Sequence, residues 1–315
     1  MGDHIRFAFL EDRGILGVGG EDRIGFLQGL VSNDMEKVGP SRALYAALLT
    51  PQGKYLFDFF VVETKGALLL DCERNRLKDL EKRLSVYKLR ADVTLDDRTD
   101  DFAVAALFGG GAAEALGLEG GPGSAVPFGD GTAYVDPRLA AAGARAVLPG
   151  ANARKVIEAA GFASAEAADY DRLRLKLGLP DGSRDLITEK SVLLESGFEE
   201  LNGIDWDKGC FMGQELTART KYRGLVKKRL VPVTLDGPPP EPGTPVMLAD
   251  GEAGELRSGM ATEEGGIGLA LMRLDRMAEA AETGAEFSAG GVGVKPVKPD
   301  WAAFWERRRW ENVGP

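Results

Sequence analysis

The chain has 315 residues, and 44% of them are hydrophobic, which is enough to build one or more buried cores. Acidic residues outnumber basic residues by 49 to 39, and the net charge of −10 disfavours nonspecific binding to nucleic acid or to an anionic membrane surface. The composition also excludes several catalytic classes, because a single histidine, His4, cannot serve Ser-His-Asp catalysis, Cys-His catalysis and a histidine-rich metal site.

The sequence contains no apolar run near the ~20 residues that span a bilayer. Residues 1–6 include an acid and lack the apolar core of a signal peptide. We therefore expect a cytoplasmic protein that has neither a membrane nor a nucleic acid as a direct partner. The two cysteines, Cys72 and Cys210, lie far apart without a CxxC pattern, so we expect no metal site and no disulfide framework.

The first part of the chain predicts an α+β unit. Apolar residues at spacings of three and four after two acids predict a helix over 21–31. Apolar runs separated by turn signals then predict strands over 44–49, 55–62 and 67–72. A second helix is expected over 74–90, where leucines recur at helical spacing.

A second unit is expected to begin near Asp97, with a strand over 102–108. Glycine dominates 109–131, which predicts loops and short elements. Later segments predict one more strand and two helices, over 145–148, 152–160 and 165–177. The early glycines at 14, 17, 19 and 20 do not complete a dinucleotide-binding GxGxxG pattern.

Cys210 lies in a segment, residues 208–215, whose sequence favours a reactive thiol. Gly209 and Gly213 permit backbone angles that a side chain would forbid, so the thiol is expected on a tight turn. The ammonium of Lys208 would favour the thiolate, which is the reactive form of cysteine. The alternative is a buried cysteine that only packs.

A basic segment follows the cysteine turn. It places six positive charges in eleven residues without an acid: Arg219, Lys221, Arg223, Lys227, Lys228 and Arg229. Such a run is typical of a solvated strand face, but it could also attract an anionic ligand to an otherwise acidic chain.

Residues 238–243 contain four prolines and mark a boundary. The short apolar runs that follow, at 245–248, 254–260 and 266–272, predict a small antiparallel barrel. The last segment carries aromatic residues on roughly one helical face, which favours a helix packed over the barrel rather than a membrane anchor: Trp301, Phe304, Trp305 and Trp310.

Several motifs together resemble one family. They are FLQGLVSND at 26–34, LTPQGK at 49–54, LLE at 193–195, NG at 202–203 and KGCFMGQELTARTKYRG at 208–224. Their residues, order and spacing are similar to those of the YgfZ family of folate-binding proteins, which act in iron–sulfur protein maturation. The likeness spans about residues 15–230 and is strongest to the branch that contains a mitochondrial assembly factor.

The resemblance implies the three-domain, α+β fold of the T-protein of the glycine cleavage system, a tetrahydrofolate-dependent aminomethyltransferase (GcvT). Two interleaved α+β units would surround a folate-binding hole within residues 1–230, and a barrel would follow over 231–298, with an aromatic tail over 299–315. The first unit would combine approximately 23–96 with 181–230. The second would combine 1–22 with 97–180.

The resemblance also implies site residues. Asp58 stands where the T-protein has a catalytic carboxylate, and burial among phenylalanines would raise the pKa of such an acid unless it faces outward. Lys176 replaces a glutamate that contacts the pterin, and Cys210 replaces an acid. We assign Cys210 and Lys208 to the chemistry, and we assign five residues to folate binding: Asp58, Gln214, Glu215, Arg219 and Arg223.

The leading interpretation is a tetrahydrofolate-binding protein that supports maturation or repair of iron–sulfur enzymes through Cys210. Its partners would be the folate and iron–sulfur client or assembly proteins. Cys210 could reduce a substrate, carry sulfur or ligate a cluster shared with a partner. The alternatives are a tetrahydrofolate-dependent aminomethyltransferase and a noncatalytic scaffold in which Cys210 only packs.

Overall fold

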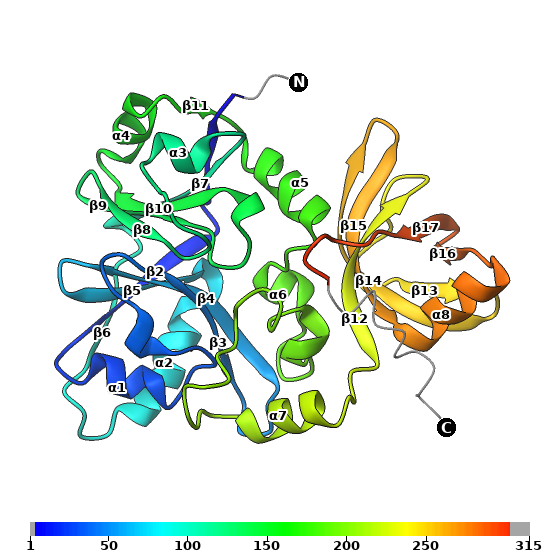
Figure 1. Ribbon diagram of the computed structural model, residues 1–315, viewed down its shortest axis with the longest axis horizontal. Coiled ribbons are helices and arrows are strands. Elements are labelled where there is room, and N and C mark those ends of the chain that lie inside the picture. Colours follow the sequence, from blue (N-terminus) through cyan, green and yellow to red (C-terminus); the bar gives the residue numbers. More distant parts are fainter. Residues whose placement is uncertain (1–3, 303–315) are drawn as a thin grey trace. The chain divides into compact units, whose positions relative to one another are not determined.

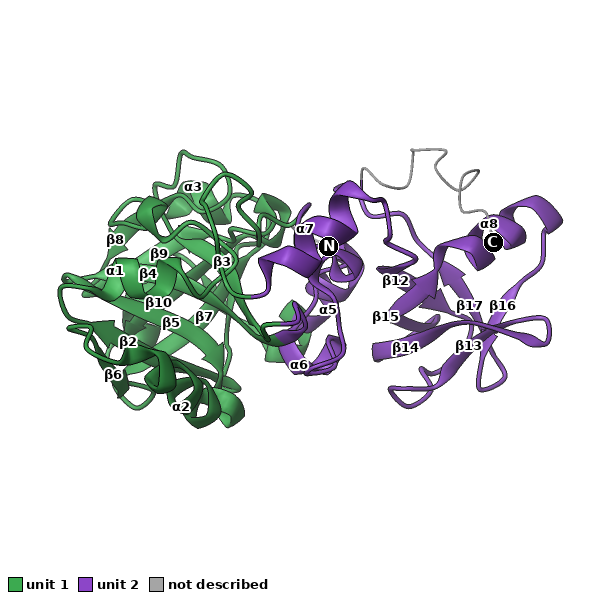
Figure 2. Ribbon diagram, turned by 90° about the horizontal axis from the view of Figure 1, so that it is seen from below, with its two compact units in different colours: residues 1–51, 56–170, 201–212 green, residues 52–55, 171–200, 213–315 purple. Residues whose placement is uncertain are grey.

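The computed structural model describes residues 4–302 (Figure 1). Within that range the chain divides into two compact units (Figure 2). Unit 1 contains the described residues up to 51, together with 56–170 and 201–212, whereas unit 2 contains 52–55, 171–200 and the described residues from 213 onward. Most of the predicted aromatic tail lies outside the described residues.

One sheet of unit 1 has five strands in the order β3-β4-β5-β2-β6. These strands are β2 (Arg13–Gly19), β3 (Leu44–Leu49), β4 (Tyr55–Thr64), β5 (Ala67–Glu73) and β6 (Thr94–Asp97). Every residue of β3 and most of β4 are buried, which explains why their sequences run apolar without alternation. The helices α1 (Arg23–Gln28) and α2 (Leu77–Lys88) contribute Leu27 and Leu80 to the same core.

The second sheet of unit 1 has six strands in the order β11-β1-β7-β10-β9-β8. They are β1 (Arg6–Phe9), β7 (Phe102–Phe108), β8 (Ala125–Phe128), β9 (Gly131–Val135), β10 (Ala144–Pro149) and β11 (Ala163–Ser164). Neighbouring strands pair antiparallel except β1 and β11. The short α3 (Ala112–Ala115) and α4 (Ala153–Ala159) pack apolar residues such as Ile157 into its core.

Buried ion pairs connect the two sheets of unit 1. Asp71 on β5 accepts hydrogen bonds from Arg13 Nε at 2.6 Å and from Arg145 Nη2, on β10 of the other sheet, at 2.7 Å. All three side chains are almost fully buried. Burial alone would raise the pKa of Asp71, but the two guanidinium groups outweigh it and hold the pKa below its usual value.

Besides residues 52–55, unit 2 contains helical segments, which are most of α5 (Ala167–Leu177), α6 (Gly182–Asp185), the 3-10 helix η4 (Leu193–Ser196) and α7 (Gln214–Tyr222). The buried Arg174 on α5 donates to Asp185 on α6 at 2.9 Å. Asp185 also accepts a hydrogen bond of 2.5 Å from Ser258 on a barrel strand. These bonds fix α5 and α6 against the barrel within unit 2.

The rest of unit 2 is a closed six-stranded barrel in the order β12-β15-β14-β13-β16-β17. Its strands are β12 (Lys228–Leu235), β13 (Pro245–Leu248), β14 (Gly251–Thr262), β15 (Gly265–Arg273), β16 (Phe287–Ala289) and β17 (Val292–Pro296), and α8 (Leu274–Thr283) follows β15. Inward-facing apolar residues such as Val233, Leu256 and Met272 form its core. Closure leaves no open sheet edge.

The structure confirms the predicted α+β class and the C-terminal antiparallel barrel. The first predicted helix is shorter than expected, because α1 ends at Gln28. Three helices, α6, α7 and α8, have no counterpart among the predicted elements. Across residues 4–302, no helix combines the length and the apolar character needed to cross a membrane.

Candidate functional site around Cys210

Cys210 is exposed on a turn at the end of unit 1. Gly209 on one side has φ +88° and Gly213 on the other has φ +81°, a left-handed conformation that side-chain-bearing residues rarely adopt. The turn leads directly into α7, for which Gly213 is the N-cap. Exposure excludes the alternative in which Cys210 is a buried packing residue.

Lys208 fixes one side of this turn. Its ammonium donates to three carbonyl oxygens, those of Gln28 at 2.7 Å, Val31 at 2.6 Å and Asn33 at 2.7 Å. An ammonium has three hydrogens, so these acceptors use all of them. Burial lowers the pKa of Lys208 to about 8, although Asp34 and Asp205 oppose this shift.

The geometry therefore assigns Lys208 a different task from the one that the sequence suggested. The sequence placed its charge beside the thiol, to favour the thiolate. In the structure the ammonium instead satisfies carbonyl oxygens at and after the C-terminal end of α1, where helical partners are missing. Lys208 thus positions the segment that carries Cys210.

Further hydrogen bonds join the cysteine segment to the residues after α1. Gln28 donates to Asp34 at 2.8 Å and to the carbonyl oxygen of Lys208 at 3.4 Å. The amide of Met212 donates to the carbonyl oxygen of Gly29 at 3.1 Å. The motif at 26–34 and residues 208–212 are therefore parts of one local structure in unit 1.

Ser32 and Asn33 connect this locus to the motif at 202–203. The Ser32 hydroxyl donates to the carbonyl oxygen of Gly203 at 2.6 Å. The Asn33 amide donates to the carbonyl oxygens of Tyr45 at 2.7 Å and of Asn202 at 2.8 Å. Polar side chains of the first motif therefore serve mainly to hold backbone segments together.

A cavity of about 310 Å³ lies beside these residues in unit 1. Its polar lining includes Asn33, Lys37, Arg42, Tyr45, Asn202 and Asp205. Lys37 pairs with Asp205, whereas the exposed Arg42 makes no ion pair in the described part of the chain. Sequence reasoning missed Lys37, Arg42 and Tyr45 as lining residues, and only Asn33 and Asn202 lay in recognised motifs.

Asp58 faces inward and is 4% exposed. Its carboxylate accepts a hydrogen bond of 2.8 Å from the Tyr45 hydroxyl. Burial, reinforced by the charge of Asp58, raises the pKa of Tyr45 well above its usual value, so this hydroxyl stays a donor at neutral pH. Asp58 is thus a buried carboxylate bonded to a residue that lines the cavity.

The four remaining residues predicted to bind folate lie on or beside α7 in unit 2: Gln214, Glu215, Arg219 and Arg223. The basic segment therefore begins on α7, continues through a short connection and ends on β12, which carries Lys228 and Arg229. Glu215, Arg219 and Arg223 are exposed, whereas Gln214 is half-buried. Two of the six cations in the segment are paired, Lys221 with Glu199 at 2.6 Å and Arg229 with Glu200 at 3.0 Å.

Gly53, in the recognised motif at 49–54, packs against the start of α7 within unit 2. A Cβ atom at this position would lie 2.8 Å from both the carbonyl oxygen of Gly213 and the Cβ atom of Leu216. Such a contact is too short for real atoms, and φ at Gly53 is +72°. Only glycine fits here without displacing the N-terminus of α7.

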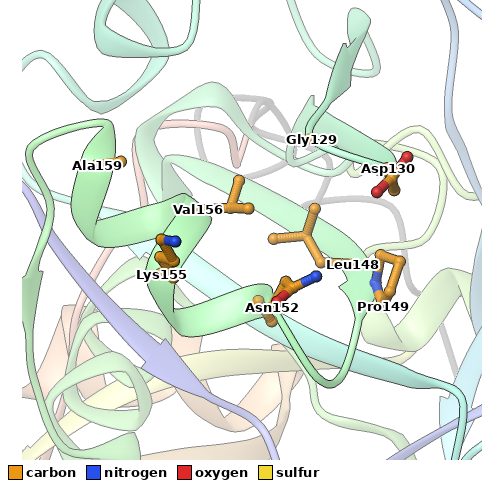
Figure 3. A pocket seen from close by; sticks show the side chains of 9 residues that line it. Gly129, Asp130, Leu148, Pro149, Asn152, Lys155, Val156 and Ala159 are labelled. Carbon is orange, nitrogen blue, oxygen red and sulfur yellow. The ribbon is translucent and has the colours of Figure 1, made fainter.

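A second cavity, of about 320 Å³, contains none of the predicted site residues (Figure 3). It lies between α4 and the ends of β8 and β10, with Leu148 and Val156 in its middle. Lys176, the residue expected near a pterin, is exposed on α5. Cys72 is buried, which raises its pKa to about 12 and leaves it a protonated thiol at neutral pH.

The described residues, 4–302, form no metal-binding cluster. No three His, Cys, Asp or Glu side chains there are grouped so that they could hold a metal ion.

Comparisons with known proteins extend these observations. Residues 227–304 match the model of the CAF17 C-terminal beta-barrel domain. The chain is 34% identical to the mouse iron-sulfur cluster assembly factor IBA57, mitochondrial, over 93% of this chain and 84% of the mouse protein. The human IBA57 is 32% identical over the same shares.

Among solved structures, the glycine cleavage system aminomethyltransferase T from Bartonella henselae matches with a TM-score of 0.73. The match covers 93% of this chain and 85% of that protein at 16% identity, so it shows a shared fold and confirms the GcvT-like architecture. The relatives correct one expectation. The prediction of a cytoplasmic protein is wrong, because the related IBA57 proteins are named as mitochondrial.

Proposed function

Because the chain belongs to the IBA57 branch of the YgfZ family, we propose that it is an iron–sulfur cluster assembly factor whose essential group is the Cys210 thiol. The observation that carries this proposal is the exposed thiol on a turn that two left-handed glycines and three Lys208 hydrogen bonds hold in place. A thiolate presented in this way can attack sulfur or ligate iron.

The cluster would be cargo that Cys210 shares with a partner. Protein-held clusters usually take four thiolate ligands, and this chain has two cysteines, of which Cys72 is buried. A partner iron–sulfur protein would therefore bring the remaining ligands to the exposed turn. Repair of damaged clusters in client enzymes would use the same thiol.

We also propose that the chain binds tetrahydrofolate. The shared fold with an aminomethyltransferase, the cavity in unit 1 and the buried Asp58 support this. A carboxylate such as Asp58 accepts the hydrogen bonds that a pterin amino group offers. When bound, the folate would supply one-carbon or reducing chemistry.

Complementation tests the role of Cys210. In a strain that lacks this gene, wild-type protein should restore iron–sulfur enzyme activities and Cys210→Ser should not. Cys72→Ala is the matched control, because it removes the other thiol, and it should restore them at equal protein levels. Full restoration by Cys210→Ser would contradict the proposal and favour the noncatalytic scaffold.

Calorimetry with tetrahydrofolate at low salt tests the folate proposal separately. Absence of a heat of binding would contradict the folate proposal but would not affect the proposed role of Cys210. The shared fold with an aminomethyltransferase also keeps one-carbon transfer as the alternative function. Formation of methylene-tetrahydrofolate by the purified protein would establish that alternative, and its absence would exclude it.

A further inference from the structure

The C-terminal end of α7 exposes two large apolar side chains next to exposed cations. Tyr222 is 75% exposed and Leu225 is 49% exposed. We call this surface the α7 patch and define it as Arg219, Tyr222, Arg223, Leu225 and Lys227. It begins nine residues after Cys210, in unit 2.

The patch is ordered rather than frayed. The amide of Leu225 donates to the carbonyl oxygen of Thr220 at 3.0 Å, and the amide of Gly224 donates to that of Lys221 at 3.1 Å. Gly224 has φ +63°. This pair of bonds around a left-handed glycine is the Schellman motif, which ends the helix in a defined conformation.

The charges of the patch are available to a partner. Arg219, Arg223 and Lys227 are exposed and make no ion pair with any described residue. Lys221, by contrast, is bound to Glu199 at 2.6 Å. The patch therefore carries three uncompensated positive charges on a chain of net charge −10.

Helix stability explains only part of this arrangement. Cations in the last turn interact favourably with the helix dipole, which accounts for Arg219 and Arg223. These two residues are also four positions apart, and like charges at that spacing repel each other. Neither effect explains why Tyr222 and Leu225 remain exposed, since apolar surface in water is unfavourable.

Tyrosine and arginine are, with tryptophan, the residues enriched among the few that carry most of the binding energy at protein interfaces. A nucleic acid would need a longer track of cations, because each contact neutralises one phosphate and strong binders make six or more. The acidic chain would also repel a polyanion beyond the patch. These points favour a protein partner.

We propose that the α7 patch docks an acidic segment of a partner protein that also carries an apolar or aromatic side chain. Acidic residues of the segment would pair with Arg219, Arg223 and Lys227, and its apolar side chain would cover Tyr222 and Leu225. The proposal rests on the proposed function in one respect: the docked protein would be the one that receives or brings the cargo of Cys210.

Binding of defined peptides to the full chain tests the proposal without iron, sulfur or folate. The probe is a fluorescent twelve-residue peptide in which glutamates flank a central Phe-Leu pair, measured by anisotropy. Tyr222→Ala should weaken its binding at least tenfold. Arg219→Gln combined with Arg223→Gln should weaken it at least tenfold and reduce its dependence on salt.

Matched controls on another helix separate docking from general charge effects. Leu89→Ala and Arg90→Gln change an exposed leucine and an exposed arginine at the end of α2, and both should leave binding within twofold. All five substituted side chains are exposed, so the folded state should be unaffected, which circular dichroism will verify.

Three outcomes would overturn the proposal. The first is no binding of the peptide at low ionic strength. The second is that a pentaglutamate peptide without apolar residues binds equally well and that Tyr222→Ala has no effect. These two results together would show that the site selects negative charge alone, as a site for a folate tail would. The third is tighter binding of a single-stranded oligonucleotide. Because no assay here involves Cys210, failure would leave the proposed function intact.

Discussion

At the scale of single residues, burial gives the two cysteines different chemistry. Cys72 lies in the core of the five-stranded sheet, and its pKa of about 12 keeps it protonated. Cys210 is exposed on its turn. A thiol reacts with alkylating agents as the thiolate and only when a reagent can reach it.

We therefore predict that iodoacetamide modifies Cys210 and not Cys72 in the native protein, and both after denaturation. Mass spectrometry of the alkylated peptides checks this. Cys210→Ala should change the free energy of unfolding by less than about 0.5 kcal/mol, because truncating an exposed side chain opens no cavity. Protection of Cys210 in the native protein would contradict the reactive-site assignment.

Asp58 gives a second prediction at this scale. Asp58→Asn keeps the shape of the side chain but removes its negative charge. That charge strengthens the hydrogen bond that the carboxylate accepts from the Tyr45 hydroxyl. Hydrogen bonds to charged groups are worth ~1.5–3 kcal/mol, so we expect an affinity for tetrahydrofolate about tenfold lower or more. Calorimetry measures it, and Tyr45→Phe is the partner variant. Unchanged affinity in both would place the folate elsewhere.

At the scale of elements, some strands were predicted to the residue, whereas β1 and β2 had no predicted counterpart. β3 and β13 begin and end where the sequence predicted, because a short apolar run between turn signals has few alternatives. α7 was missed because most of its residues are polar, and because its N-cap is Gly213 rather than a serine, threonine or aspartate. Local patterns could not reveal it.

The site was predictable to a similar extent. The glycine spacing around Cys210 indicated the turn, and a buried Asp58 was one of two stated possibilities. The acceptors of Lys208 were not predictable, because Gln28, Val31 and Asn33 precede it by 175 residues or more. Contacts of that separation follow from the fold and leave no periodic signal in the sequence.

Lys208 links the end of α1 to the cysteine turn through three hydrogen bonds. Its loss should therefore destabilise this whole local structure. Lys208→Met keeps the stem and leaves three carbonyl oxygens without their donor. We expect the free energy of unfolding to fall by about 2 kcal/mol or more. Urea unfolding at pH 7, below the Lys208 pKa of about 8, measures it. Lys227→Met, at an exposed lysine, is the control, and an equal effect of both would refute the anchoring role.

At the scale of the whole molecule, a charged contact holds together two sheets that are distant in sequence. Asp71 accepts hydrogen bonds from Arg13 on its own sheet and from Arg145 on the other sheet. Buried pairs are weak evidence for net stability, because desolvation opposes the attraction. Removing one partner is different, since it leaves the other charge buried and uncompensated.

Asp71 therefore predicts how unit 1 responds to substitution and to acid. Asp71→Asn should lower the free energy of unfolding by about 3–5 kcal/mol at pH 7, because it leaves two buried guanidinium groups without a charged partner. The pKa of Asp71 is lowered in the folded state, whereas an unfolded aspartate titrates near ~3.9. Its stabilising contribution is thus fully present above that pH and is lost as the pH falls through the folded pKa.

Urea unfolding of the wild type and of Asp71→Asn, from neutral pH down to about pH 3, tests both statements. The difference between the two proteins should be largest at neutral pH and should shrink in acid, because protonation of Asp71 makes the wild type resemble the variant. Asp100→Asn is the control, since this aspartate is 99% exposed and its loss should matter by less than about 0.5 kcal/mol. A difference that stays constant down to pH 3 would mean that the two sheets are held by packing, with the ion pair contributing nothing that protonation can remove.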